Sequence, residues 1–178
     1  SPSGTYVIVN GAIDEGQYDR TNIFLRATGA LHASWTTYGR PSHFDLTYDG
    51  NGDEVAVGVS KSAPDDGSII KKRLSDGTVT RLTSFGYGWH TSARNYQSRG
   101  VGVSAFGPNL PEWGTHSDEA ILVGLDALDD IQTICLMSSI TNDYWAEPQP
   151  TISPDGSKII FAGKDGLGTY FCSTIATA

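Results

Sequence analysis

Apolar and polar positions alternate over short runs along the chain, and most of these runs are bounded by turns rich in glycine, aspartate or serine. Alternation with a period of two is typical of a β-strand that buries one face. Four segments share one pattern, in which a glycine-containing turn precedes an alternating or wholly apolar run. They are SPSGTYVIVN (1–10), DGNGDEVAVG (49–58), YQSRGVGVSA (96–105) and SPDGSKIIFA (153–162). The sequence therefore predicts an all-β chain built from an internal repeat.

The repeat is slightly shorter than 50 residues. Its aligned glycines are Gly4, Gly52, Gly100 and Gly156, which by subtraction are 48, 48 and 56 residues apart. The longer last interval fits an insertion at 107–117, where glycine and proline are frequent. A strand repeat of this length is typical of a β-propeller, in which each repeat forms one four-stranded blade. We expect four blades, at approximately 1–37, 38–84, 85–141 and 142–178.

Two of the expected blades are incomplete. The first begins at its second strand and the last lacks a fourth strand, so the blades have three, four, four and three predicted strands. An open arc of this kind leaves strand edges and blade faces uncovered. We expect a segment of a larger propeller ring; the alternative is that copies of the chain associate to complete a ring.

The composition of the chain argues against nucleic acid as a partner and against membrane insertion. The net charge is -8 and the twelve lysines and arginines are scattered, whereas nucleic-acid binding needs a basic stripe. No apolar run approaches the roughly 20 residues of a membrane helix, and we expect no membrane insertion. Cys135 and Cys172 lie in strand-like runs and are either buried thiols or, in an oxidising compartment, a disulfide. The chain opens within a motif, so a signal peptide could precede it, and we expect a secreted or periplasmic protein.

Two stretches carry a resemblance to known propellers. PTISPDGSKIIFAG (150–163) resembles the repeat of TolB-type propellers, in which SPDG forms a hairpin before an inner strand. WHTSARNYQSRGVGVSAF (89–106) is similar to a strand pair of the propeller polysaccharide lyases, the oligogalacturonate-lyase-like and ulvan-lyase-like proteins. There a histidine opens the strand and an Arg-Asn pair follows, as His90, Arg94 and Asn95 do here.

The preceding blade carries the same resemblance. SHFDLTYDGNGDEVAVGV (42–59) places His43 and Asp45 at the start of its strand. The chain departs from the lyase pattern at Ala93, where such proteins often have cysteine before the Arg-Asn pair. A structural metal bound through that cysteine is therefore in doubt here.

The connections between blades carry most of the residues that could bind a ligand or catalyse a reaction. In a propeller they run toward the central axis, so YGRPSH (38–43), FGYGWH (85–90) and NDYWAEPQ (142–149) should meet at one mouth. Aromatic rings stack on sugar faces and arginine pairs with carboxylates, which suits a uronate. The groups collected there are Tyr38, Arg40, His43, Tyr87, Trp89, His90, Tyr144, Trp145 and Glu147.

The lyase resemblance implies β-elimination. A base removes the proton at C5 of a uronate while arginine or a divalent metal neutralises its carboxylate, and an acid protonates the leaving oxygen. The sequence assigns no metal ligands. The candidate catalytic residues are His43 or His90 as base, Tyr87 or Tyr144 as acid, and Arg94 or Arg40 as the neutralising cation. The candidate substrate-binding residues are Arg40, Trp89, Asn95, Trp145 and Tyr38.

Structural roles compete with each of these assignments. The histidines could bond a neighbouring blade, the tryptophans could pack between blades, and Arg94 could pair with Asp45. Two other function classes also stay open: a non-catalytic TolB-like propeller that binds a protein or glycan, and a structural arc that self-assembles.

Three weaker patterns lie elsewhere. DGNGDE (49–54) echoes half of a calcium loop, but Ser60 stands where the loop needs a bidentate glutamate, so a plain hairpin is favoured. His32 is expected to be structural. His116, near Asp118 and Glu119, offers a weak metal-binding pattern.

Overall fold

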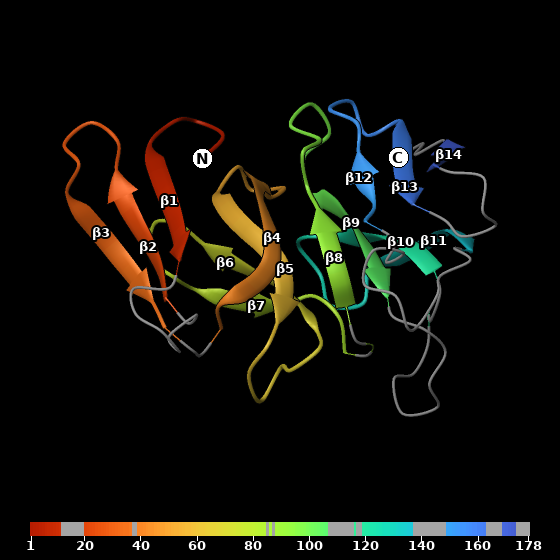
Figure 1. Ribbon diagram of the computed structural model, residues 1–178, viewed down its shortest axis with the longest axis horizontal. Coiled ribbons are helices and arrows are strands. Elements are labelled where there is room, and N and C mark those ends of the chain that lie inside the picture. The colour runs from red at the N-terminus through yellow and green to blue at the C-terminus, as the bar shows by residue number, and fades with distance from the viewer. Residues whose placement is uncertain are drawn as a thin grey trace.

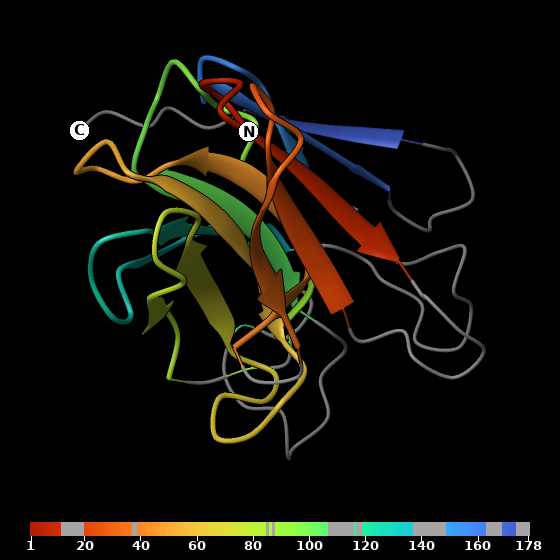
Figure 2. The same ribbon diagram turned by 90° about the vertical axis from the view of Figure 1, so that its left-hand side faces the viewer.

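The computed structural model describes residues 1–11, 20–36, 39–84, 86, 88–106, 116, 119–136, 149–162 and 169–173. The regular elements in these ranges are all β-strands, and they form four antiparallel sheets that succeed one another along the chain (Figure 1). Over the same ranges, no helix is long and apolar enough to cross a membrane. Figure 2 looks onto the first sheet, with the other sheets behind it.

Within each sheet, neighbouring strands are consecutive in sequence, as in the blades of a propeller. The first sheet has the order β1-β2-β3 and the second has the order β4-β5-β6-β7. Their strands are β1 (Tyr6–Gly11), β2 (Arg20–Leu25), β3 (Leu31–Trp35), β4 (Pro41–Tyr48), β5 (Glu54–Ser60), β6 (Ile69–Arg73) and β7 (Val79–Arg81).

The third sheet has the order β8-β9-β10-β11 and the fourth has β12-β13-β14. The prediction of an all-β propeller segment of nearly four blades is therefore confirmed, with three, four, four and three strands. The strands of these two sheets are β8 (Gly88–Ser92), β9 (Val101–Phe106), β10 (Glu119–Gly124), β11 (Ile131–Leu136), β12 (Thr151–Ile152), β13 (Lys158–Ala162) and β14 (Thr169–Ser173).

Three apolar cores hold neighbouring sheets together, one at each junction. Strand β10 contributes to two of them. Ile121 and Val123 join the core shared with the second sheet, whereas Ala120 and Leu122 join the core shared with the fourth. A strand covered on both faces needs apolar side chains at successive positions, which explains why 120–123 reads as an unbroken apolar run.

The repeated glycine has a conformational cause. Gly4, Gly52, Gly100 and Gly156 have φ angles of 75°, 85°, 82° and 73°, a left-handed region that glycine enters without steric cost. In the first, second and fourth sheets the glycine N–H donates to the carbonyl three residues earlier, over 2.9, 3.0 and 2.9 Å. The sequence repeat thus marks a left-handed glycine just before each of the strands β1, β5, β9 and β13.

The turns nevertheless differ by one residue, which the aligned glycines hide. The turn before β5 closes between Asp49 and Asp53, and the turns before β1 and β13 close between Ser1 and Tyr6 and between Ser153 and Lys158. A shift of one residue moves every side chain to the other face of a strand. Ile160 therefore corresponds structurally to Val55, and Val9 to Ala56.

The turn before β13 also predicts an acidic carboxyl. Asp155 Oδ1 accepts hydrogen bonds from Ser153 Oγ at 2.6 Å, Ser157 N at 3.0 Å and Ser157 Oγ at 2.8 Å. The Ser153 hydroxyl first, and then the Ser157 amide and hydroxyl, lower the pKa of Asp155 from 3.8 to about 2. These bonds to the charged form stabilise the fold above pH 3.8, and their contribution disappears as the pH falls through about 2.

Carboxyl carbon NMR should show Asp155 titrating near pH 2. The double replacement Ser153→Ala and Ser157→Ala should raise the midpoint towards 3.8, because it removes both hydroxyl donors and leaves only the Ser157 amide. A midpoint near 3.8 in the unmodified protein would contradict this hydrogen-bond arrangement.

Candidate functional site

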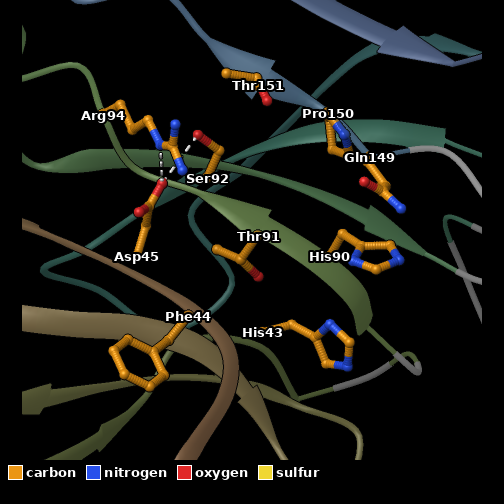
Figure 3. Close-up of a pocket in the computed structure, with 10 residues that line it drawn as sticks. All are labelled: His43, Phe44, Asp45, His90, Thr91, Ser92, Arg94, Gln149, Pro150 and Thr151. Atoms are coloured by element: carbon orange, nitrogen blue, oxygen red, sulfur yellow. Dashed lines mark hydrogen bonds and ion pairs between the residues drawn. The ribbon is translucent and has the colours of Figure 1, made fainter. Parts of the chain in front are cut away.

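A cavity of about 210 Å³ lies where the second, third and fourth sheets meet (Figure 3). Its walls come from β4, from β8 and the residues after it, and from the segment that leads into β12. Two histidines, one arginine and one aspartate are among the lining residues, which are His43, Phe44, Asp45, His90, Thr91, Ser92, Arg94, Gln149, Pro150 and Thr151.

Both histidines sit at β-bulges. In β4 the register shifts between Ser42 and Asp45, and in β8 it shifts between Gly88 and His90. A bulge adds one unpaired residue, bends the strand and re-aims its side chains. His43 adopts a φ of 47° within its bulge, a region that costs a non-glycine residue roughly 1–3 kcal/mol. The fold tolerates this strain at the residue that lines the cavity.

The residue opposite the first bulge explains how it is accommodated. A Cβ atom on Gly58 of β5 would lie 2.6 Å from the Ser42 carbonyl oxygen and 2.8 Å from Phe44 Cβ. Only glycine leaves room for the bulged backbone to pack this closely against β5. Gly58 is therefore part of what positions His43.

The two bulges bring the imidazoles together. The His43 and His90 ring centroids are 4.8 Å apart, and the rings meet edge to face at 85° (Figure 3). His43 is exposed and His90 is half-buried. Imidazole changes charge near neutral pH and can accept a proton, donate one or ligate a metal. The arrangement can therefore support proton transfer or metal binding at the cavity.

A cation lines the same cavity, at the end away from the histidine pair (Figure 3). Arg94 Nε donates to Asp45 Oδ2 at 3.0 Å, and Ser92 Oγ and Ala93 N donate to the same oxygen at 3.3 Å each. The Arg94 side chain is 63% exposed. Asp45 thus holds one edge of the guanidinium while the edge with Nη1 and Nη2 remains accessible. Arg94 therefore pairs with Asp45, the structural role expected as an alternative, and its exposed edge can still bind a ligand.

The fourth sheet supplies groups that the sequence pattern had not singled out. Gln149 is exposed and Thr151 is half-buried at the cavity wall, beside Pro150. Among the described residues there is no cluster of three or more histidine, cysteine, aspartate or glutamate side chains that could hold a metal ion. The lining residues whose nitrogen or amide oxygen could ligate a metal are His43, His90 and Gln149. Gln149 is the last residue of the third connection that should run toward the axis (142–149), and this position could have identified it as a cavity residue.

Two predicted site residues lie elsewhere. Asn95 is completely buried and its Nδ2 donates to the Ser98 carbonyl, which ties down the turn after β8. Arg40 Nη1 donates to Asn10 Oδ1 at 3.3 Å, and Arg40 is not among the residues that line the cavity. The structure therefore brings together His43, His90 and Arg94 from the predicted set.

The remaining predicted groups fall outside what is described. Tyr38, Tyr87, Tyr144, Trp145 and Glu147 lie outside the described residues, as does Asp118. The backbone of Trp89 belongs to β8, but its side chain is not described.

The weaker patterns have structural explanations. In DGNGDE (49–54) Asp49 Oδ1 accepts the Asn51 and Asp53 amides, and Oδ2 pairs with Lys71 at 2.7 Å. The segment is thus the favoured hairpin. His32 Nε2 lies 3.2 Å from the Leu74 carbonyl oxygen and 3.1 Å from that of Ser75, so it carries a proton and ties β3 to the next sheet.

His116 lies apart from the cavity. Its Nδ1 is 2.5 Å from Glu119 Oε2, and Thr133 Oγ1 donates to the same oxygen at 2.8 Å. A hydrogen-bonded trio at the start of β10 accounts for these side chains without a metal.

The architecture is shared with solved propellers of unrelated roles. No protein-family model and no curated protein matches this sequence. An oligogalacturonate lyase in complex with manganese is similar in structure, with a TM-score of 0.60 and 14% identity over 96% of this chain and 45% of that chain. Kuenenia stuttgartiensis hydrazine synthase matches with a TM-score of 0.56 and 12% identity, over 97% of this chain and 51% of that chain.

A third solved structure, KlAtg21 in complex with the coiled-coil of AgAtg16, matches with a TM-score of 0.56 at 10% identity, over 97% of this chain and 51% of that chain. This chain thus spans about half the length of the propellers that it matches. At such identities the likeness concerns the fold and does not separate lyases from other propellers. The chain is an arc of a β-propeller.

Proposed function

We propose that the cavity binds a uronate unit of an acidic polysaccharide and cleaves the chain by β-elimination. The observation that carries the proposal is that two imidazoles and one accessible guanidinium, contributed by adjacent sheets, line a single cavity. An acidic polysaccharide as substrate agrees with a secreted or periplasmic location.

Arg94 provides the recognition of charge. A carboxylate can accept two parallel hydrogen bonds from the outer edge of a guanidinium, and the bond from Arg94 Nε to Asp45 fixes the other edge. Pairing the uronate carboxylate with a cation makes the neighbouring C5 proton more acidic, because the negative charge that develops on its removal is stabilised.

The histidine pair provides the base. A neutral imidazole of His43 or His90 removes the C5 proton, the electron pair forms the C4–C5 double bond, and the C4–O bond breaks. The leaving oxygen takes a proton from an acid, so that the two products together contain every atom of the polymer. Tyr87 and Tyr144 stay the candidates for that acid.

A divalent metal is compatible with the cavity. The manganese in the oligogalacturonate lyase structure suggests the test, and imidazole nitrogens with an amide oxygen suit such ions. Gln149, and whichever of His43 and His90 is not the base, would hold the metal here. When bound, it would supply positive charge at the uronate carboxylate.

Incubation with polygalacturonate, alginate and other uronate polymers, with and without Mn²⁺, should produce the ultraviolet absorbance of an unsaturated uronate. Arg94→Gln should raise KM and also lower kcat, because it removes both the ground-state binding of the carboxylate and the stabilisation of the charge that develops when the C5 proton leaves. Saturable binding without unsaturated product would overturn the elimination and favour a glycan-binding propeller. Neither product nor binding would overturn the whole proposal.

A further inference from the structure

We infer that Arg99, in the turn between β8 and β9, is a second carboxylate-binding site, which holds a neighbouring uronate unit of the chain whose reacting unit is bound by Arg94. The inference rests on the proposed function for the identity of the ligand, an acidic oligosaccharide. Because the net charge of the protein is -8, binding a polyanion requires a local concentration of positive charge. The two arginines at the ends of this turn supply it.

The turn has a fixed shape and lies inside the arc. The Ser98 N–H donates to the Asn95 carbonyl oxygen at 2.8 Å, and the buried Asn95 amide donates to the Ser98 carbonyl oxygen, which closes residues 95–98. The Gln97 N–H donates to the Pro154 carbonyl oxygen at 3.0 Å. Figure 1 shows this turn beside the turn that joins β12 and β13. It is therefore placed between the second and fourth sheets, away from the outer faces of the arc.

Both arms of the turn are anchored on β4. On one arm the Ala93 N–H donates to Asp45 Oδ2 at 3.3 Å, and on the other the Gly100 N–H donates to the Tyr48 carbonyl oxygen at 3.3 Å. Asp45 and Tyr48 are three residues apart on one strand, so the two anchor points are about 10 Å apart. Each arginine is adjacent in sequence to one of the anchored amides.

The two guanidinium groups are held in different ways, and both keep N–H groups for a ligand. Arg99 Cζ lies 4.3 Å from the centroid of the Tyr48 ring. Such stacking occupies the face of a guanidinium and leaves the N–H groups in its plane available. Arg94 is held through Nε by Asp45 instead. Both arginines are exposed, and because each is already held in place, less side-chain freedom is lost when a carboxylate binds.

The turn also presents an aromatic ring between the two cations in the sequence. Tyr96 is 46% exposed, and a ring on a fixed backbone offers an apolar face with little conformational entropy to lose. A polyuronate carries a carboxylate on every unit, so one chain can reach both arginines. We therefore expect the turn and the cavity to bind at least two units together.

Calorimetric titration with uronates of different length tests this site. The probes are galacturonate, hexagalacturonate and fully methyl-esterified hexagalacturonate, which has no charge. Protein with both His43→Ala and His90→Ala is used beside the unmodified protein, so that the ligand is not consumed. The hexamer should bind roughly tenfold or more tightly than the monomer, because its second contact is intramolecular. Methyl esterification should remove this gain.

Replacing Arg99 separates the second site from the first. Arg99→Gln should weaken binding of the hexamer by roughly tenfold, as expected when hydrogen bonds to a charged group are lost, and leave binding of the monomer unchanged. Arg99→Lys keeps the charge without the planar fork and should recover only part of the loss. Arg94→Gln should weaken binding of both ligands. Arg26→Gln is the matched control, since it removes the same charge from an exposed arginine in a turn of the first sheet.

The results distinguish this inference from the proposed function. Unchanged hexamer binding in Arg99→Gln, an equal loss for monomer and hexamer, or an equal loss in Arg26→Gln would overturn the second site and leave the elimination standing. Length-dependent binding through Arg99 without unsaturated product would overturn the elimination and leave the second site. No binding of any probe, in the unmodified protein and the histidine variant alike, would overturn both.

Discussion

Replacing the base with alanine should lower the rate of uronate β-elimination by roughly 10²–10⁴-fold, the usual contribution of a general base. His43 and His90 are the two candidates, and their rings are 4.8 Å apart at the cavity. The base is the one whose replacement lowers kcat and removes the limb of the pH–rate profile that reports imidazole deprotonation. The other replacement should act mainly on KM or on Mn²⁺ dependence, as expected for a binding group.

His32→Gln is the matched control. It replaces an imidazole that bonds the Leu74 and Ser75 carbonyls outside the cavity, and an amide can still donate there. Its kinetics should match those of the unmodified protein. Full activity in both His43→Ala and His90→Ala would remove the histidine pair from the chemistry.

Asp49→Ala should lower the free energy of unfolding by about 3–5 kcal/mol at neutral pH, the cost of leaving one member of a buried ion pair alone. The Asp49 and Lys71 side chains are 3% and 11% exposed, and Lys71 also reaches Asp126 of the third sheet at 3.1 Å. The replacement would leave the Lys71 ammonium with less compensation and the Asn51 and Asp53 amides without the acceptor Oδ1.

The effect should depend on pH. Burial alone raises the pKa of Asp49, but the Lys71 ammonium and the Asp53 and Asn51 amides outweigh it and hold that pKa below 3.8. A carboxyl whose folded pKa is lowered stabilises the fold above its unfolded pKa and loses that contribution as the pH falls through the folded value. The difference between Asp49→Ala and the unmodified protein should therefore shrink below pH 3.8.

Urea unfolding at several pH values measures this difference. Asp53→Ala is the control, since Asp53 is 41% exposed and lies 3.5 Å from Arg73. Exposed pairs contribute about 0–1 kcal/mol, so this variant should stay close to the unmodified protein. Equal losses in the two variants would show that the Asp49–Lys71 pair has no special weight.

The fold followed from local chemistry that the sequence displays. Left-handed glycines such as Gly52 and alternating runs such as 54–59 are set by steric and burial requirements within a few residues. The composition of 119–124 also suits a helix, and only its place in the repeat predicts the strand that forms there. The sequence does not show that the turns at Gly52 and Gly156 differ in length by one residue. In both turns the glycine stands three residues after the first residue of the turn, and only the residue that closes the turn by a backbone hydrogen bond differs.

The site was predictable in part. The convergence of connections on a common axis predicted that His43 and His90 would meet, and they do so across adjacent sheets. The bulges that aim them depend on packing against Gly58 and on strand register, which no short motif records. Adjacent Arg94 and Asn95 suggest a single binding unit in the sequence. In the structure the Asn95 side chain is buried and the Arg94 side chain is exposed, so only Arg94 lines the cavity.

The two-sided strand β10 has a consequence for how the protein is made. Its rows Ala120 and Leu122, and Ile121 and Val123, are hidden by different neighbours, so the third sheet cannot shield both by itself. During synthesis the second sheet leaves the ribosome before the third, and residues 152–161 of the fourth sheet leave after both. The apolar side chains of Ala120 and Leu122 therefore stay exposed on the nascent chain until the fourth sheet has been synthesised. During that time they can bind chaperones or associate wrongly with other chains.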